Sequence, residues 1–567
     1  MRDITAREDA GVRLTAVVAA SIGLVLLFGD VTGIDALVRL SGAAVLAVAL
    51  LRWLDEAHHE LTGVVVALWV ATGALGVVQP GLELRTYATI VGLAVVIGSA
   101  LTLLAELRDD VRNWAAVTGA AAGIVLGLAA VVWPTVTVLV LAVAVGGFTV
   151  LRAVAAFAGT VRVRSTDRPG WVALALRLSG LVAAVLVLIV AVAINRSGPD
   201  AVSAFYDAPD ELPGPAGTLV RTEQVQPFLS GATAHRVLYV TTSRTGQEVT
   251  ATGLVVVPEG AAPNGGRPVA AFTHGTIGIA RDCAPSALDG SVYGPAIPGA
   301  RQFLDAGYVV VAPDYAGLGS EATTGYLVGT DEARSTLDGV RAAAAVDDAD
   351  VSSRFVVYGE SQGGHAALFT GEQAGEYAPE LDLVGVAAAA PATDLRELLA
   401  ANLGTPFGDI LASFALASWV DAYPELDLDL DDVVDPDARP AVERLATMCI
   451  QDQRQIVALF AEAAILAERF LSALPWEVDP WASVIEENTP GRSPTDAPVL
   501  ILQGEDDPLV LPAVQERWVE DLCAVTSSVE FRTYPDVGHL DAGHATAADI
   551  VEWAGQRMSG EDPVSTC

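Results

Sequence analysis

The sequence contains no lysine: its 32 basic residues are all arginines, and 69 aspartates and glutamates outnumber them. The net charge of −37 argues against a nucleic-acid partner, because phosphate backbones bind basic surfaces. The chain also lacks the H-E-x-x-H, paired C-x-x-C and P-loop patterns, so we expect no metal ion and no cofactor. Charged residues make up only 18% of the chain and hydrophobic residues 52%, which excludes an intrinsically disordered protein.

The charge is unevenly distributed and divides the chain near Ser197. Residues 1–197 hold 14 arginines and 13 acidic residues, which leaves 18 arginines and 56 acidic residues for the rest. A near-neutral apolar part followed by an acidic part indicates a membrane region joined to a water-soluble domain. We expect a transmembrane helical domain over 1–196, a linker leading into the outer domain over 197–217, and a folded domain over 218–560.

Seven apolar runs in the first part have roughly the 17 to 24 residues that a membrane-spanning helix needs. They occupy residues 12–28, 34–51, 61–78, 86–104, 114–133, 135–157 and 171–194. Arginines gather before the first run and in alternate loops, so the positive-inside rule places the N-terminus in the cytoplasm. This predicts a multi-pass protein of the cytoplasmic membrane, in contact with the lipid bilayer, whose second part lies outside.

Glycines recur at matching positions in three apolar hairpins, at residues 23, 73 and 127 and again at 42, 92 and 146. Small residues let helices approach closely in lipid. Together with the turns Gln79-Pro80 and Trp133-Pro134, this pattern resembles the six-helix membrane proteins of the acid-resistance HdeD type. The first part is therefore predicted to be an all-α bundle of three hairpins and a seventh helix.

All four cysteines, Cys283, Cys449, Cys523 and Cys567, lie in the second part. Outside the cytoplasm they would form two disulfides, with three possible pairings. Chain order favours Cys283 with Cys449 and Cys523 with Cys567.

Short β-branched runs alternate with helical stretches throughout the second part, which predicts a mostly parallel sheet covered by helices. The runs are 236–242, 253–257, 269–273, 308–312, 355–358, 384–388, 499–503 and 529–534.

One of these runs, 355–358, leads directly into Gly359-Glu360-Ser361-Gln362-Gly363 and then an alanine-rich helical stretch. This is the G-x-S-x-G motif in the strand–turn–helix context that exposes a nucleophilic serine. Ser361 is the predicted nucleophile.

A serine hydroxyl needs a base and an orienting acid, which follow the serine in the order acid, then histidine, on this type of fold. Asp507, after the buried run 499–503, is preferred as the acid because of its spacing from Gly504 and Val510; Asp506 and then Glu505 are the alternatives. His539, after the last run, is preferred as the base over His544.

The oxyanion of a hydrolysed carbonyl also needs hydrogen-bond donors. We expect the backbone N–H of Gln362, the residue after the nucleophile, and the backbone N–H of Thr276, after the run 269–273. His274 is expected to shape that turn, and His365 to be a packing or polar helix residue.

Several further motifs in the second part resemble the secretory lipases related to yeast lipase A. These motifs are Phe205-Tyr206, His274-Gly275-Thr276, Cys283-Ala284-Pro285-Ser286, Pro313–Gly319, Leu337–Arg341 and Gly359–Gly364. The resemblance implies a capped α/β-hydrolase that cleaves acyl esters, with Ser361, Asp507 and His539 as its triad and Cys283 in a disulfide. Members of that family are usually secreted in soluble form, so the membrane part is a departure.

About 100 residues separate Pro391 from Pro498, more than a strand–helix–strand connection requires. Amphipathic segments near 409–420 and 441–474, broken by the acidic run 427–437, predict a helical cap over about 395–495. We expect it to act as a lid that supplies the acyl-binding surface.

The sequence thus predicts a membrane-anchored serine esterase or lipase that acts on an acyl ester or lipid. An acyltransferase with the same triad is the enzymatic alternative. A stress-tolerance membrane protein with an inactive hydrolase domain is the non-enzymatic one. No pattern indicates an oligomeric state.

Overall fold

The computed structural model describes most of the second part of the chain and a little of the first. The described residues are 67–68, 70–72, 84–108, 117, 120–125, 127–128, 202–225, 229–288, 290–450, 453–467 and 469–567. The chain divides into two compact units: Met1–Ser197 with Phe460–Glu468, and Gly198–Leu459 with Arg469–Cys567.

The described part of the first unit centres on helix α4 (Leu84–Arg108), which contains the predicted span 86–104. Two of the repeated glycines approach closely here: a Cβ on Gly127 would lie 2.7 Å from the backbone oxygen of Gly92. This agrees with the expected role of small residues in helix packing. Within the described part of the chain, no helix is both long and apolar enough to cross a membrane. The other six predicted spans lie wholly or partly outside the described residues, so the membrane bundle stays a prediction.

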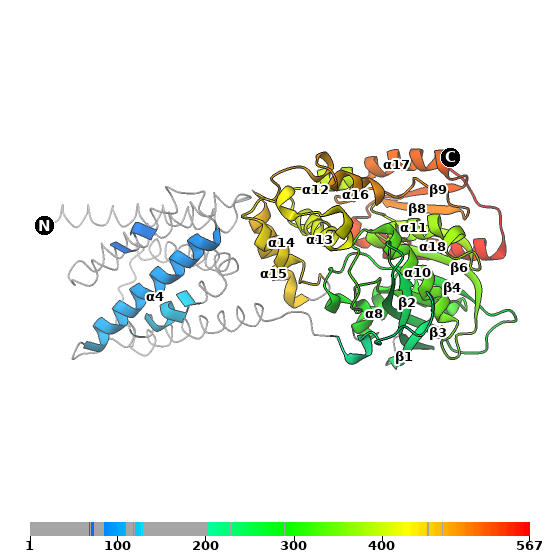
Figure 1. Ribbon diagram of the computed structural model, residues 1–567, viewed down its shortest axis with the longest axis horizontal. Coiled ribbons are helices and arrows are strands. Elements are labelled where there is room, and N and C mark those ends of the chain that lie inside the picture. The colour runs from blue at the N-terminus through cyan, green and yellow to red at the C-terminus, as the bar shows by residue number, and fades with distance from the viewer. Residues whose placement is uncertain are drawn as a thin grey trace, which may run out of the picture. The chain divides into compact units, whose positions relative to one another are not determined.

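In the second unit, the described residues form one sheet of nine strands (Figure 1). The strands are β1 (Leu219–Val225), β2 (Ala232–Thr242), β3 (Glu248–Pro258), β4 (Arg267–Thr273), β5 (Val309–Pro313), β6 (Val351–Glu360), β7 (Asp382–Ala389), β8 (Val499–Gly504) and β9 (Val529–Tyr534). Their order is β1-β2-β3-β5-β4-β6-β7-β8-β9. The pairs β1–β2, β2–β3 and β3–β5 are antiparallel. From β5 onward in this order, each neighbouring pair (β5–β4, β4–β6, β6–β7, β7–β8 and β8–β9) is parallel.

All eight predicted strands are present, and the mostly parallel sheet is confirmed. Strand β1 was missed because its sequence, LVRTEQV, lacks a run of buried apolar residues; it lies at the edge of the sheet and is partly exposed. β1 forms because its backbone pairs with β2, which is a contact between separate segments and not a local preference of its sequence.

Helices cover both faces of the sheet because both faces of its central strands are apolar. In β4, Val269 and Ala271 join one core cluster, and Ala270 and Phe272 join the other. The first cluster includes side chains of α10 (Gly329–Ala343), α11 (Gln362–Tyr377) and α17 (Pro512–Val525). The second includes side chains of α9 (Ala300–Asp305) and α18 (Ala542–Ser559). The short helix α8 (Gly290–Ala296) precedes α9.

The long connection between β7 and β8 is helical, as expected for a cap. Its helices are α12 (Leu395–Asn402), α13 (Pro406–Ala422), α14 (Arg439–Leu445), α15 (Gln453–Leu466) and α16 (Trp481–Glu487). Helix α13 begins with an N-cap in which the hydroxyl of Thr405 accepts the N–H of Gly408. The predicted segment 441–474 is two helices, α14 and α15. In the acidic run, Leu428 and Leu430 are buried while the neighbouring aspartates are exposed, so the run forms solvated surface as predicted.

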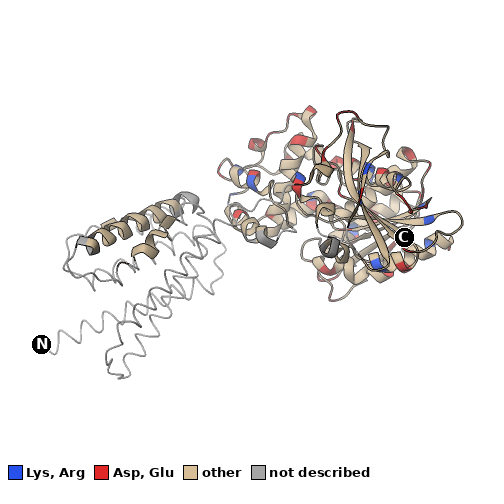
Figure 2. Cartoon of the chain, turned by 90° about the horizontal axis from the view of Figure 1, so that it is seen from below, with Lys and Arg blue, Asp and Glu red and all other residues tan. Residues whose placement is uncertain are grey.

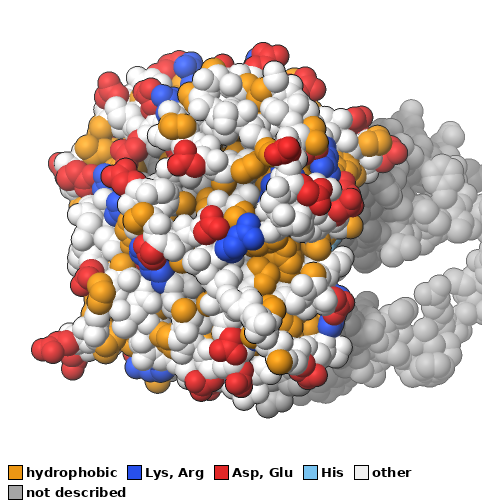
Figure 3. Space-filling view, turned by 90° about the vertical axis from the view of Figure 1, so that its right-hand side faces the viewer, with side chains coloured by type: hydrophobic (Ala, Val, Ile, Leu, Met, Phe, Trp, Pro, Cys, Tyr) orange, Lys and Arg blue, Asp and Glu red, His pale blue; other side chains and the backbone are white. Residues whose placement is uncertain are grey.

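Two disulfides join Cys283 to Cys449 and Cys523 to Cys567, the pairing that chain order favours. The first ties the loop after β4 to the cap just after α14, and the second ties α17 to the C-terminal tail. Acidic residues are spread along the elements of this unit (Figure 2), and on the face seen in Figure 3 acidic side chains lie scattered with fewer arginines among them.

Candidate active site

Ser361 lies in the sharp turn between β6 and α11, at the N-cap of the helix. Its backbone has φ 55° and ψ −119°, a conformation that a non-glycine residue rarely adopts. Two positions before and two positions after the serine, the turn has room only for glycine. A Cβ on Gly363 would lie 1.9 Å from the backbone oxygen of Thr273, and one on Gly359 would lie 2.2 Å from the Thr273 hydroxyl. The G-x-S-x-G pattern is therefore explained by the crowded approach of β4 to the turn.

A hydrogen-bonded chain connects the serine to a histidine and a carboxylate that are far away in sequence. His539 Nε2 lies 3.0 Å from Ser361 Oγ, and His539 Nδ1 lies 2.8 Å from Asp507 Oδ2. The side chain of Asp507 is fully buried and that of His539 is 8% exposed. Asp507 Oδ1 accepts the backbone N–H groups of Leu509 and Val510, at 2.9 and 2.8 Å. These bonds fix the carboxylate so that it orients the imidazole.

The alternatives weighed from the sequence are not in this chain of contacts. Glu505 and Asp506 are exposed on the turn after β8, and His544 is exposed on α18. His274 packs against the ring of Tyr315 with centroids 4.3 Å apart, and its nitrogens face the carbonyl oxygens of Gly275 and Asp314. It shapes the turn after β4, as expected.

The two predicted oxyanion donors come from neighbouring elements. Gln362 is the first residue of α11, and Thr276 lies in the loop after β4, where its hydroxyl is 2.9 Å from the Tyr326 hydroxyl. Both residues line the same pocket as Ser361. The N-terminus of α11 adds its partial positive charge at this point, which favours a negative oxygen there.

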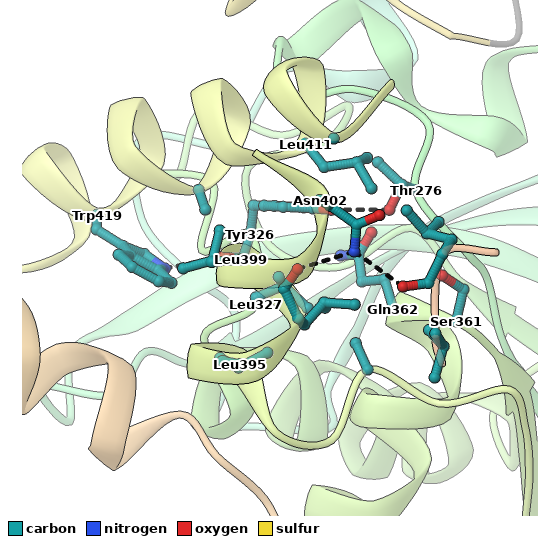
Figure 4. Close-up of a pocket in the computed structure, with 16 residues that line it drawn as sticks. Thr276, Tyr326, Leu327, Ser361, Gln362, Leu395, Leu399, Asn402, Leu411 and Trp419 are labelled. Carbon is teal, nitrogen blue, oxygen red and sulfur yellow. Dashed lines mark hydrogen bonds between the residues drawn. The ribbon is translucent and has the colours of Figure 1, made fainter. Parts of the chain in front are cut away.

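A mostly apolar pocket extends from Ser361 beneath helices α12 and α13. Figure 4 shows Ser361 and Trp419 at opposite ends of the lining residues, with leucines of α12 and α13 between them. Asn402, on α12, is a polar residue of this lining. Its amide donates to the carbonyl oxygens of Leu398 and Leu509, both at 2.8 Å, and so joins α12 to the turn that carries Asp507. The cavity has the character of a site for a hydrocarbon chain.

Two acidic residues near the serine were not recognised from the sequence. Glu360 precedes the nucleophile; burial raises the pKa of its carboxyl, while the nearby His544 and His539 act in the opposite direction. Glu332, on α10, is completely buried and contacts the side chains of Gln362 and His365. The only local signal for Glu332 is a charged residue on the apolar side of a helix, which does not indicate its partner.

Two family models match segments of the chain, one in each part. Residues 300–566 match the family model described as secretory lipase, and residues 118–189 match the model described as a short repeat of unknown function, DUF308. These matches support the two resemblances drawn from the sequence, the first at the level of the lipase family.

The relatives are named as lipases, and one of them is named a probable inactive lipase. Lipase 5 of Candida albicans is 27% identical over 305 residues, which cover 50% of this chain and 64% of that protein, just under two thirds of its length. A secreted triacylglycerol lipase of Malassezia globosa is 26% identical over 350 residues, covering 59% of this chain and 74% of that one. A Mycobacterium tuberculosis protein named a probable inactive lipase is 26% identical over 364 residues, covering 61% and 79%.

The fold has solved counterparts. Candida antarctica lipase A in its closed state superposes with a TM-score of 0.54 at 20% identity, over 64% of this chain and 87% of that one. A putative hydrolase from Legionella pneumophila superposes with a TM-score of 0.53 at 19% identity, over 61% of this chain and all of that one. The predicted α/β-hydrolase fold of the second part is thereby confirmed.

Proposed function

We propose that the second unit is a serine hydrolase that cleaves carboxylic esters of fatty acids through an acyl-enzyme. The observation that carries the proposal is the hydrogen-bonded chain from Ser361 through His539 to Asp507. It supplies a nucleophile, a base and an orienting acid in the arrangement that acyl transfer requires. The match to the secretory lipase model points to the same class of substrate.

In the first half-reaction, Ser361 Oγ attacks the ester carbonyl carbon as His539 Nε2 takes its proton. The carbonyl oxygen becomes an oxyanion, which accepts the backbone N–H groups of Gln362 and Thr276. The bond to the alcohol oxygen then breaks, and His539 gives its proton to the leaving alcohol. Asp507 remains ionised and stabilises the imidazolium in between.

In the second half-reaction, a water molecule loses a proton to His539 and attacks the acyl-enzyme. The tetrahedral intermediate again uses the two N–H groups, and its collapse returns the proton to Ser361 and releases the carboxylic acid. The acyl chain occupies the apolar cavity beneath α12 and α13, where burial of each methylene contributes about 0.8 kcal/mol.

The test is hydrolysis of p-nitrophenyl esters from acetate to palmitate by the full-length chain in a mild non-ionic detergent. Ser361→Ala and Asp507→Asn should each lower kcat by about 10⁴-fold or more. The matched controls are Asp506→Asn and His544→Ala, which alter the exposed neighbours of the acid and the base and should retain activity.

Two outcomes would overturn the proposal. Turnover that survives Ser361→Ala would place the chemistry elsewhere. A folded wild-type protein that cleaves no ester would resemble the relative named a probable inactive lipase. Product analysis with an added alcohol separates hydrolysis from acyl transfer, because a transferase would form the new ester at the expense of the free acid.

We further propose that the first unit holds the hydrolase at the outer face of the cytoplasmic membrane. The seven apolar runs and the arginine pattern support the tether, and the two disulfides support an oxidising compartment. A protease added to intact expressing cells should then cleave the second unit, and the uncleaved chain should sediment with membranes after carbonate washing. Recovery of the chain in the soluble fraction, or full protection in intact cells, would refute this location.

A further inference from the structure

A buried network of polar side chains lies directly behind the oxyanion site. Glu332 Oε1 accepts the side-chain N–H of Gln362 at 2.7 Å and the backbone N–H of Leu327 at 3.1 Å. Glu332 Oε2 lies 2.7 Å from His365 Nδ1. Glu332 and His365 are completely buried, and Gln362 is 4% exposed. None of these side chains belongs to the Ser361–His539–Asp507 chain.

The hydrogen bonds specify where the protons of this pair lie. His365 Nε2 faces the backbone oxygen of Asn488 at 2.9 Å, and because a carbonyl oxygen only accepts, this nitrogen carries hydrogen. The contact between Nδ1 and Glu332 Oε2 needs a second hydrogen. Glu332 Oε1 accepts two N–H groups, and this second hydrogen lies between Nδ1 and Oε2, so the polar atoms of the pair are all satisfied.

The network joins the nucleophile helix to the cap. Asn488 ends α16; its side-chain oxygen accepts the N–H of Gly329 at 3.0 Å, and its amide donates to the Tyr423 hydroxyl at 2.6 Å. Tyr423 follows α13, whose residues wall the cavity, and Arg244 lies 3.8 Å above its ring. Figure 4 shows Gln362 and Leu327, two of the residues anchored by Glu332, on the lining of the cavity.

We propose that Glu332 and His365 are positioning residues for the oxyanion step, which hold Gln362 against the cap so that its backbone N–H points at the reacting carbonyl. The inference rests on the proposed ester hydrolysis and deepens it. Gln362 is anchored at both ends: its backbone begins α11, and its side chain is tied to Glu332. A donor held from two sides cannot turn away from the substrate, and a displacement of about 1 Å in such a site costs on the order of 100-fold in rate.

The pair can be tested with substitutions that keep or remove the hydrogen bonds. In Glu332→Gln, the amide oxygen can still accept from Gln362 and Leu327, and the amide nitrogen can donate to a neutral His365. This variant should retain kcat within about threefold. Glu332→Ala removes the anchor and should lower kcat by about 10- to 100-fold with KM nearly unchanged, because the loss falls on the transition state.

A double-substitution cycle identifies the residue through which Glu332 acts. Gln362→Ala keeps the backbone N–H but removes its anchor, so it should lower kcat about as much as Glu332→Ala does. Combining the two changes should cost no more than either alone, because both break the same link. Additive losses, a Glu332→Gln variant as poor as Glu332→Ala, or a rise in KM with unchanged kcat would overturn the proposal.

Hydrogen exchange of the full-length chain provides a readout that does not depend on activity. Amides of residues 359–366 should exchange faster in Glu332→Ala than in wild type, and at the wild-type rate in Glu332→Gln. Unchanged exchange in Glu332→Ala would overturn the positioning role even in an active enzyme. A wild-type protein without Ser361-dependent turnover would instead overturn the proposed hydrolysis, while the exchange rates would still report the positioning.

Discussion

Glu372 should make the folded protein less stable above neutral pH, and a glutamine in its place should remove that cost. The residue lies on α11, and burial raises the pKa of its carboxyl from 4.5 to about 7. The backbone N–H groups of Gly491 and Arg492, together with the charges of His365 and Arg492, act in the opposite direction without cancelling the effect. The Gly491 N–H lies 2.6 Å from Glu372 Oε1.

The direction and size of the effect follow from the pKa of Glu372. Because this pKa is higher in the folded than in the unfolded chain, the carboxyl's contribution to stability is fully present below about pH 4.5. It is lost as the pH rises through about 7. The interval between 4.5 and about 7 corresponds to about 3 kcal/mol. Partial exposure of the side chain to water screens this to about 2 kcal/mol.

The assay is urea unfolding of Glu372→Gln and wild type at pH 5 and pH 8, followed by tryptophan emission. The amide oxygen still accepts the Gly491 N–H, so the substitution removes the charge and keeps the contact. The free energy of unfolding should rise by about 2 kcal/mol at pH 8 and by about 0.5 kcal/mol or less at pH 5.

Glu376→Gln is the matched control, since it alters an exposed carboxyl on the same helix and removes no burial cost. The reasoning fails if Glu372→Gln changes stability equally at the two pH values, or if it destabilises the protein at pH 8.

Three further predictions concern the disulfide at the C-terminal tail, the packing of the first unit and the cavity. Cys567→Ser removes the disulfide between cysteines 44 residues apart. In urea unfolding without reductant, it should lower the free energy of unfolding by about 3 to 4 kcal/mol. A loss below about 1 kcal/mol would contradict this. Gly127→Val places a side chain against the backbone of Gly92 and should lower the thermal unfolding midpoint of the first unit, so an unchanged midpoint would argue against their close approach. Trp419→Ala should lengthen the cavity and raise kcat/KM for palmitate relative to butyrate esters by about tenfold; a constant ratio would show that Trp419 does not limit the acyl chain.

Features of the second unit that depend on residues near one another in the sequence could be predicted from the sequence. The parallel strands are continuous β-branched runs because both of their faces are buried, which makes them recognisable without their partners. The turn at Ser361 is equally local, since its glycines, the preceding strand and the following helix lie within a short segment. The cap was predictable from the length of the connection and its amphipathic segments, because a connection of that size between two strands needs structure of its own.

Other features were decided only when distant segments met. Asp507 and Asp506 are adjacent in sequence, and what distinguishes them is that Asp507 is buried and held by two backbone N–H groups opposite His539. Strand β1 pairs along its length with β2, and its own sequence lacks the run of buried apolar residues that marks the other strands. Neither the orientation of a carboxylate nor the pairing of an edge strand is encoded by nearby residues.

The sequence by itself determined the serine turn, the parallel strands and the presence of a cap, since each follows from the chemistry of one continuous segment. Only the tertiary structure brought Glu332 to His365 and Gln362, which are about thirty positions away along the chain. A glutamate on a helix is ordinarily solvated, and its burial is tolerable here only because the partners that satisfy it arrive from another helix. A buried carboxyl without hydrogen-bond partners would destabilise the fold, so only an arrangement that brings its distant partners to it is stable.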